Sequence, residues 1–76
     1  MQYKLVALRK SDGETQRDIA SLLGITEQAY RNKENGKTEF KMNEMFDLAR
    51  HFNAKIEEIF LPRKYTIREQ MKDKIK

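Results

Sequence analysis

Turn-forming sequences divide this 76-residue chain into short segments of helical pattern. They are Ser11-Asp12-Gly13, Gly24, Asn35-Gly36, Asn53-Ala54 and Pro62. Glycine readily takes the positive backbone φ that ends a helix, and proline cannot continue one. Between these signals the apolar residues recur at three- and four-residue spacing, which is typical of helices rather than strands. The pattern therefore predicts five short helices and an all-α fold.

The expected boundaries of the first two helices follow from local capping signals. We expect the first helix over residues 3–10. The second begins after Thr15, whose hydroxyl is a good N-cap, with Asp18 three residues later as the partner in a capping box. It ends at Gly24.

The remaining helices are predicted in the same way. The third follows the N-cap Thr26 and runs to about Glu34, the fourth is capped by Asn43, and the fifth occupies residues 56–60. Five short helices can bury one compact core. The residues expected in it are Leu5, Leu8, Ile19, Leu22, Leu23, Ile25, Tyr30, Met45, Leu48, Ala49, Phe52, Ile56, Ile59 and Phe60.

Composition excludes several classes of protein. The chain has no cysteine, so it can form no disulfide and no cysteine-ligated metal site, and His51 is its only histidine. We therefore expect no metal and no cofactor, and we expect no enzyme because no catalytic constellation is evident. No segment approaches the ~20 apolar residues of a membrane span. We expect a cytoplasmic protein with no membrane partner and no small-molecule ligand.

The net charge of +4 is not spread evenly along the chain. Residues 1–61 carry ten basic and ten acidic side chains, so the whole excess lies in residues 62–76. In this basic tail Ile67, Met71 and Ile75 form a narrow apolar stripe at helical spacing. A helix of this length is marginal in water by itself. We expect the tail to be a marginal helix or disordered, and its stripe to contact a dimer mate or another partner.

The segment from Thr15 to Lys37 has the lengths of a helix-turn-helix. Ala20 is small enough for close approach of the two helices, Gly24 relieves strain in the turn, and Ile25 fills the angle between them. In such a unit the second helix enters the major groove of DNA. Residues 1–61 are therefore predicted to form a DNA-binding domain.

One face of the third predicted helix carries side chains suited to reading bases. Gln28, Arg31 and Asn35 share this face, flanked by Glu27 and Asn32. Gln, Asn and Arg have forked donors and acceptors that match adenine and guanine edges. The alternative is an ordinary solvated face, which the position in a helix-turn-helix disfavours.

The whole of residues 4–61 resembles the lambda-repressor-like, Cro/CI (XRE-type) helix-turn-helix family. The residues that carry the resemblance are Leu8-Arg9, Gly13, Thr15-Gln16, Ile19-Ala20, Leu23-Gly24-Ile25-Thr26, Tyr30, Glu34-Asn35-Gly36-Lys37, Leu48-Ala49 and Ile59-Phe60. The resemblance implies a compact five-helix domain that binds double-stranded operator DNA, usually as a homodimer. It implies regulation of transcription in bacteria, phages or mobile elements, and so a place at the nucleoid of a bacterial or phage-infected cell.

The resemblance also implies roles for individual residues. Base contacts are expected from Thr26, Glu27, Gln28, Arg31 and Asn32. Gln16 is expected to contact phosphate and to support Gln28, while Asn35 and Lys37 approach the DNA backbone. The basic residues around the face are expected to add phosphate contacts, and they are Arg9, Lys10, Arg17, Lys37 and Lys41.

Two residues depart from the family pattern. Lys33 stands where an apolar core residue is usual, and Glu14 replaces an apolar residue before the second helix. The stem of Lys33 can lie over Tyr30 with its ammonium in solvent or near Glu34. Alternatively, the third helix is rotated or loosely held without DNA.

Two functions remain open at this level. The first is a sequence-specific transcriptional repressor of phage or mobile-element type. The second is an antitoxin-like or adaptor module that binds another protein through residues 63–76. The second function predicts that deletion of residues 63–76 abolishes a protein complex and leaves any DNA binding intact.

Overall fold

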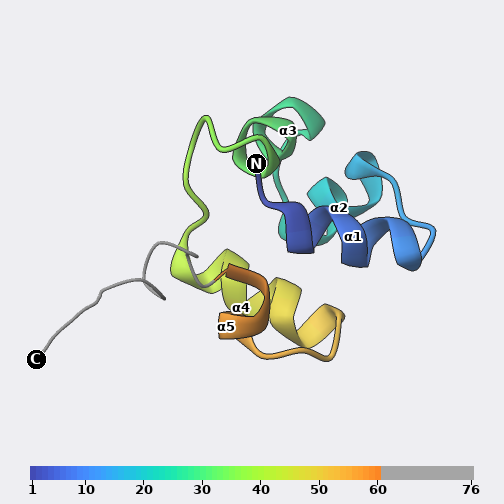
Figure 1. Ribbon diagram of the computed structural model, residues 1–76. Helices are drawn as coiled ribbons and strands as arrows, with labels where there is room; N and C mark the ends of the chain where they lie inside the picture. Colours follow the sequence, from blue (N-terminus) through green and yellow to red (C-terminus); the bar gives the residue numbers. More distant parts are fainter. Residues whose placement is uncertain (61–76) are drawn as a thin grey trace, which may run out of the picture.

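The computed structural model describes residues 1–60, and these form the helices shown in Figure 1. The helices are α1 (Tyr3–Ser11), α2 (Gln16–Leu23), α3 (Glu27–Glu34), α4 (Met42–His51) and α5 (Ile56–Phe60). Residues 1–60 contain no strand, so the prediction of an all-α fold is confirmed. The basic tail, with Ile67, Met71 and Ile75, lies outside the described residues.

The predicted caps of α2 and α3 are present. The Thr15 hydroxyl accepts from the Asp18 amide at 3.1 Å, and the Asp18 carboxylate accepts from the Thr15 amide at 2.9 Å. The hydrogen bond that the Thr15 amide donates to this carboxylate is the main cause that holds the pKa of Asp18 below its ordinary value. Gly24 ends α2 with φ of 74°, and the Thr26 hydroxyl accepts from the Ala29 amide at 3.0 Å. Local sequence therefore determines where both helices of the motif begin.

The start of α4 differs from the prediction. Asn43 lies inside the helix and is not its cap, because α4 begins at Met42 with Lys41 in the N-cap position. The Glu44 carboxylate accepts from the Lys41 amide at 2.8 Å. A carboxylate at the third helical position satisfies a free backbone donor of the helix start, so no Asn side chain is needed there.

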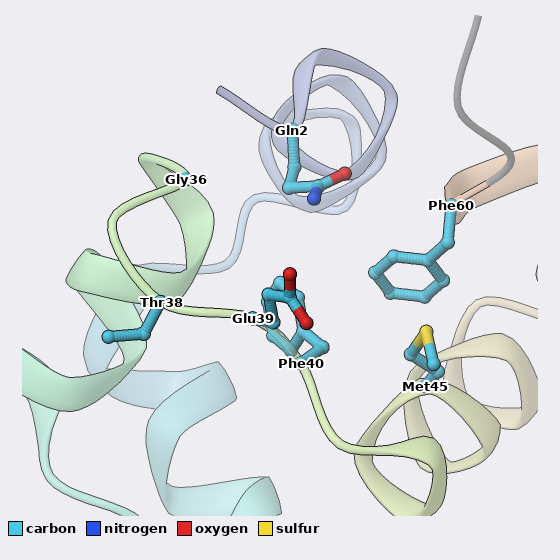
Figure 2. A pocket seen from close by; sticks show the side chains of 7 residues that line it. All are labelled: Gln2, Gly36, Thr38, Glu39, Phe40, Met45 and Phe60. Carbon is cyan, nitrogen blue, oxygen red and sulfur yellow. The ribbon is translucent and has the colours of Figure 1, made fainter. Parts of the chain in front are cut away.

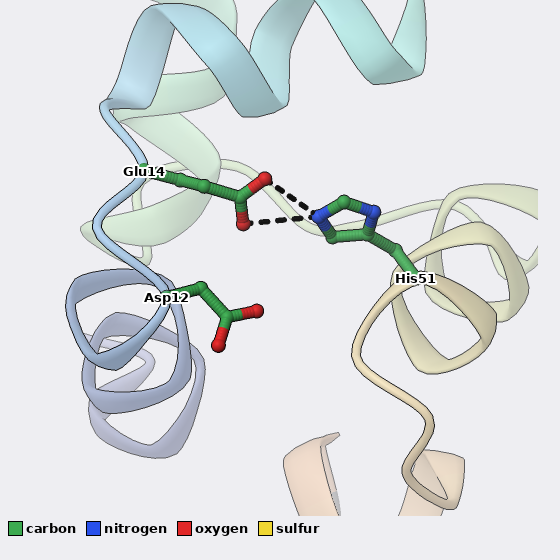
Figure 3. Close-up of side chains that lie close together, drawn as sticks. All are labelled: Asp12, Glu14 and His51. Atoms are coloured by element: carbon green, nitrogen blue, oxygen red, sulfur yellow. Dashed lines mark hydrogen bonds and ion pairs between the residues drawn. The ribbon is translucent and has the colours of Figure 1, made fainter.

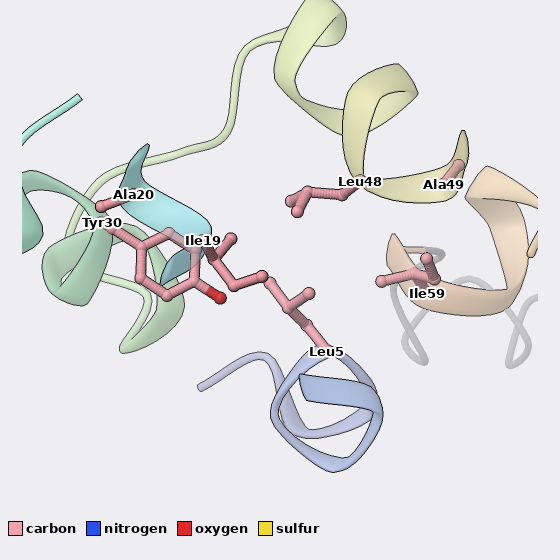
Figure 4. Close-up of a cluster of buried hydrophobic side chains, with 7 residues drawn as sticks. All are labelled: Leu5, Ile19, Ala20, Tyr30, Leu48, Ala49 and Ile59. Carbon is pink, nitrogen blue, oxygen red and sulfur yellow. The ribbon is translucent and has the colours of Figure 1, made fainter. Parts of the chain in front are cut away.

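The core lies where the five helices meet, as Figure 4 shows for its buried side chains. These are Leu5, Ile19, Ala20, Tyr30, Leu48, Ala49 and Ile59. Most of the other predicted core residues are half-buried around them, but Leu22 is wrong, since it is 45% exposed. Phe40, in the loop between α3 and α4, packs against this core and against the rings of Tyr30 and Phe60 without having been predicted.

The two ends of the described chain pack differently. The N-terminus lies against the end of α3 in Figure 1, and the Gln2 amide donates to the Glu34 carbonyl at 2.8 Å. At the other end α4 and α5 are joined by a turn in which Asn53 adopts φ of 54°. The break predicted at Asn53-Ala54 is therefore confirmed.

No helix within residues 1–60 combines the length and apolar character needed to cross a membrane.

Candidate nucleic-acid interface

Helices α2 and α3 pack closely through a short turn. Ala20 is 2% exposed and lies in the core, and the Ile25 amide donates to the Ala20 carbonyl at 3.0 Å. This hydrogen bond closes the end of α2 around Gly24 and directs the chain into α3. Two short helices joined in this way form the predicted helix-turn-helix, with α3 as the second helix.

The inner side of α3 is held by a carboxylate that is almost fully buried. Glu34 accepts from Arg9 through both of its oxygens, at 2.9 and 3.2 Å. The Tyr30 hydroxyl donates to it at 2.7 Å, and the Gln16 amide donates at 2.8 Å. These contacts join α1, α2 and α3 at one point, so Glu34 fixes the position of α3 on the domain.

Burial and hydrogen bonds set the pKa values of Glu34, Tyr30 and Arg9. Burial by itself raises the pKa of Glu34, but hydrogen bonds from Arg9, Gln16 and Tyr30 outweigh it and hold that pKa below its ordinary value. Burial and the hydrogen bond to Glu34 raise the pKa of Tyr30. The hydrogen bond to Glu34 likewise raises the pKa of Arg9. At neutral pH the site is a buried ion pair with a neutral phenol.

Arg9 was expected to contact phosphate, and the structure places it elsewhere. Its side chain is 9% exposed and is bound to Glu34, and it also donates to the Glu14 carbonyl at 3.0 Å. Every guanidinium nitrogen of Arg9 therefore has a partner inside the protein. Because this guanidinium is buried as well as paired, Arg9 belongs to the interior of the domain and not to the candidate phosphate contacts.

Lys33 was expected near solvent or Glu34, but its partner is Glu44 on α4, at 3.1 Å. The two side chains are 12% and 6% exposed, and the Lys33 ammonium also donates to the Glu39 carbonyl at 3.0 Å. The ammonium lies 5.9 Å from the centre of the Phe40 ring. Lys33 thus fills a core position by pairing its charge, and this pair joins α3 to α4.

The outer side of α3 presents most of the residues predicted to contact bases, and they bind one another. Arg31 donates to Gln28 Oε1 at 3.1 Å and to the Glu27 carboxylate at 3.1 Å. Gln28 in turn donates to Asn32 Oδ1 at 3.1 Å. The other oxygen of Glu27 lies 3.5 Å from Arg17, so two arginines neutralise this carboxylate. We call Glu27, Gln28, Arg31 and Asn32 the outer network.

Gln16 joins the inner and outer sides of α3. Its amide nitrogen donates to Glu34, and its amide oxygen accepts from Arg31 at 3.2 Å. Gln16 had been expected to support Gln28, but the structure brings it to Arg31 instead. Sequence reasoning missed Glu34 as the centre of this arrangement, because its partners Arg9 and Gln16 lie 25 and 18 residues away in the chain.

The other predicted phosphate contacts are all exposed. Arg17 is on α2, Asn35 and Lys37 follow α3, Lys10 is on α1, and Lys41 precedes α4. The Lys37 amide donates to the Asn32 carbonyl at 2.8 Å, which holds the loop after α3 against its last turn. Arg17, beside Glu27, and Lys37 therefore place one cation near each end of α3.

His51 belongs to a separate surface cluster, shown in Figure 3. Its Nε2 lies 2.8 and 2.9 Å from the two oxygens of Glu14, and Asp12 lies beside the pair. The ring of His51 also packs edge-on against Phe52. Glu14, the second departure from the family pattern, thus ties the loop before α2 to the end of α4. Sequence reasoning missed this pair, because the partners are 37 residues apart.

A pocket of about 290 Å³ lies between the loop after α3 and helices α4 and α5, as Figure 2 shows. Its lining residues are Gln2, Gly36, Thr38, Glu39, Phe40, Met45 and Phe60. None of these belongs to the outer network. The pocket is therefore separate from the surface that α3 presents.

Comparison with known proteins agrees with this geometry. The helix-turn-helix family HTH_3 matches residues 5–59. The chain belongs to this family of XRE-type helix-turn-helix domains. It is also 36% identical over 61 residues to an uncharacterised HTH-type transcriptional regulator of Methanocaldococcus jannaschii. That alignment covers 80% of this chain and 92% of the relative.

Membership of the family identifies α2 and α3 as the two helices of the helix-turn-helix. In helix-turn-helix proteins the second helix enters the major groove and its side chains contact base edges. DNA binding in the regulation of transcription therefore describes this chain at the level of its family.

Proposed function

We propose that this protein is a sequence-specific repressor that binds double-stranded operator DNA as a homodimer. The observation that carries the proposal is the outer network, in which Gln28, Arg31 and Asn32 lie together on the exposed side of α3. These side chains have the donors that match base edges in the major groove. The Methanocaldococcus jannaschii relative, by its name a transcriptional regulator, supports the same function.

In this proposal base contacts and phosphate contacts come from different residues. Thr26, Glu27, Gln28, Arg31 and Asn32 face the bases. The phosphate contacts come from exposed polar and basic residues, namely Lys10, Arg17, Asn35, Lys37 and Lys41. Gln16 was predicted among them, but its amide nitrogen donates to Glu34 and its oxygen accepts from Arg31, so it positions Arg31 instead. Phosphate contacts set the register of the protein on the duplex, and base contacts discriminate sequence.

A homodimer follows from the small size of the module. One short helix contributes limited affinity, and two linked modules read half-sites roughly 34 Å apart on one side of the duplex. Among the described residues Met42 and Phe46 lie one turn apart on α4 and are 59% and 51% exposed. They offer an apolar surface to a second copy, in addition to the stripe predicted in the tail.

Repression needs no further domain, because a dimer that occupies an operator blocks access of RNA polymerase to the promoter. We also propose that the protein acts at the nucleoid, as a regulator of the phage or mobile-element type. A reporter whose promoter overlaps the selected site should lose expression when the protein is produced. Increased expression would mean that the protein is an activator.

Selection of bound duplexes from random DNA is the experiment that tests the proposal. Recovery of a two-fold symmetric motif is expected, and recovery of no enriched motif would falsify sequence-specific binding. Arg31→Ala should relax preference at one base pair of each half-site, at a cost of about 1–3 kcal/mol in binding. Lys37→Ala is the comparison variant, since loss of a phosphate contact weakens binding to all sequences alike and lowers the dependence on salt.

A further inference from the structure

The hydrogen bonds of the outer network have a defined direction. Arginine has only donors, and an ionised carboxylate has only acceptors. The amides of Gln16 and Gln28 must therefore turn their oxygens toward Arg31, which donates to both. Because the Gln28 oxygen is bound to Arg31, its nitrogen donates onward to Asn32 Oδ1.

This direction starts at the buried carboxylate of Glu34. Glu34 can only accept, so the Gln16 nitrogen must face it and the Gln16 oxygen must face outward. That oxygen accepts from Arg31 Nε at 3.2 Å and holds the guanidinium over Gln28. A group that is 2% exposed thus sets the orientation of side chains on the DNA-facing surface.

The result is a surface that offers donors. The amide oxygens of Gln16, Gln28 and Asn32 are bound inside the protein, and both carboxylate oxygens of Glu27 face arginines. Each of these amide oxygens already accepts a hydrogen bond, whereas several N–H groups have no partner within residues 1–60, namely the second N–H of the Gln28 amide, the N–H groups of Asn32 and the remaining N–H groups of Arg31. Guanine presents two acceptors, O6 and N7, in the major groove, whereas adenine presents one acceptor and one donor.

We propose that α3 selects guanine rather than adenine at the base pairs it contacts, and that Glu34 is the positioning residue for this preference, acting through Gln16. This inference rests on the proposed function and specifies the base that α3 contacts. A free glutamine amide can pair with adenine through its oxygen and nitrogen together. Here Arg31 holds the Gln28 oxygen, so that mode is disfavoured.

Base analogues in the selected operator test the first half of the proposal. The wild-type protein should select guanine at the α3 positions. Replacement of that guanine by 7-deazaguanine, which lacks the N7 acceptor, should weaken binding about tenfold or more. Inosine is the matched control, because it keeps both O6 and N7 and should change affinity by less than about twofold. Adenine at these positions, or indifference to 7-deazaguanine, would overturn the guanine preference.

Gln16→Met tests the second half, because methionine keeps the length of the side chain and loses both hydrogen bonds. This variant should fold, lose most of its guanine preference and respond less than about twofold to 7-deazaguanine. Gln2→Met is the matched control, since Gln2 lies outside the outer network and should leave the selected motif unchanged. A Gln16→Met motif identical to that of the wild type would overturn the positioning role.

Arg9→Lys separates positioning from stability. It weakens the ion pair with Glu34 and leaves the contact between Glu34 and Gln16 in place. The melting temperature should fall and the selected motif should stay the same. If the wild-type protein selects no motif at all, the proposed function fails, whereas a wild-type motif without guanine dependence refutes only this inference.

Discussion

The inner and outer sides of α3 carry the same kinds of groups in different surroundings. On the inner side Glu34 and Lys33 each pair with a partner on another helix, and all four side chains are 12% exposed or less. On the outer side Glu27 and Arg31 pair within α3, and they are 37% and 41% exposed. Opposite charges meet on both sides, but only the inner pairs have lost their water.

This difference assigns different tasks to the two sides. Breaking a buried pair leaves an uncompensated charge in the protein and is strongly destabilising. An exposed pair contributes little to stability, since water replaces either partner. The inner pairs therefore hold α3 in place, while the outer pairs contribute little to the stability of the fold.

Glu34→Ala should produce the largest effect on stability. It removes the acceptor of four hydrogen bonds and leaves the charge of Arg9 buried without its partner. We expect a loss of about 3–5 kcal/mol in the free energy of unfolding, measured by urea denaturation. Glu57→Ala, at an exposed position of α5, is the control and should change it by less than about 0.5 kcal/mol. A loss below about 1 kcal/mol for Glu34→Ala would mean that the inner pair does not hold α3.

Acid should weaken the same contact by titration. The folded-state pKa of Glu34 lies below its ordinary value of 4.5, so its contribution to stability is complete above that value. The contribution is lost as pH falls below 4.5 and through the folded-state pKa, because the unfolded chain then binds the proton more readily. Urea denaturation over this range should show the decline. Glu34→Gln cannot titrate at this position, so an equally steep decline in that variant would assign the acid sensitivity to other carboxyl groups.

Lys33→Met should cost about 2 kcal/mol, because it leaves the Glu44 carboxylate buried without a cation. The double variant with Glu44→Gln removes both charges and keeps an acceptor for the Lys41 amide. We expect it to recover most of the loss, since a buried pair can be replaced as a unit without penalty. Thermal and urea unfolding of the three proteins provide the measurement. No recovery in the double variant would show that Lys33 is needed for more than neutralising Glu44.

Thr26→Ala should cost about 1 kcal/mol, the usual value for loss of an N-cap. The Thr26 hydroxyl accepts from the Ala29 amide. Removal of the hydroxyl leaves this amide without its acceptor in the protein. Thr26 lies at the start of α3 and Glu34 at its end, so the substitution should fray the first turn without releasing Glu34. Amide hydrogen exchange should rise in the first turn and remain slow at the end of α3. Uniformly faster exchange along α3 would contradict this local effect.

Arg31→Met should have the smallest effect on folding, within about 0.5 kcal/mol, because its partners are at the surface. The same variant should lose base preference in DNA selection. Stability close to that of the wild type with altered DNA preference would sharpen the distinction between the two sides. A stability loss comparable with that of Glu34→Ala would abolish it.

Local signals in the sequence were sufficient for the helices of the motif. Thr15, Gly24 and Thr26 act on backbone groups within a few residues, so their roles can be read without knowledge of the fold. Asn43 failed as a cap because α4 begins one residue earlier, at Met42, and Glu44 at the third helical position binds the Lys41 amide. Leu22 failed as a core residue because the apolar stripe of α2 is wider than the surface it buries.

Contacts between distant residues were beyond what spacing can predict. Arg9 and Glu34 are 25 residues apart, and a basic residue near a DNA-reading helix is most simply interpreted as a phosphate contact. Lys33 had been recognised as unusual, yet its partner Glu44 lies on a helix whose placement depends on the whole fold. The exposed side of α3 was predicted from helical periodicity, whereas the bonds among its side chains depend on Gln16 from another helix.

The outer network also has a thermodynamic consequence for association. Long side chains such as Arg31, Gln28 and Gln16 lose rotamer freedom when they are immobilised, at about 0.5–1.5 kcal/mol each on binding. Their mutual hydrogen bonds restrict that freedom before DNA arrives. Association should therefore carry a smaller entropic penalty than for a similar helix with unconstrained side chains. Calorimetry of Gln16→Met would register the restored freedom as a less favourable binding entropy.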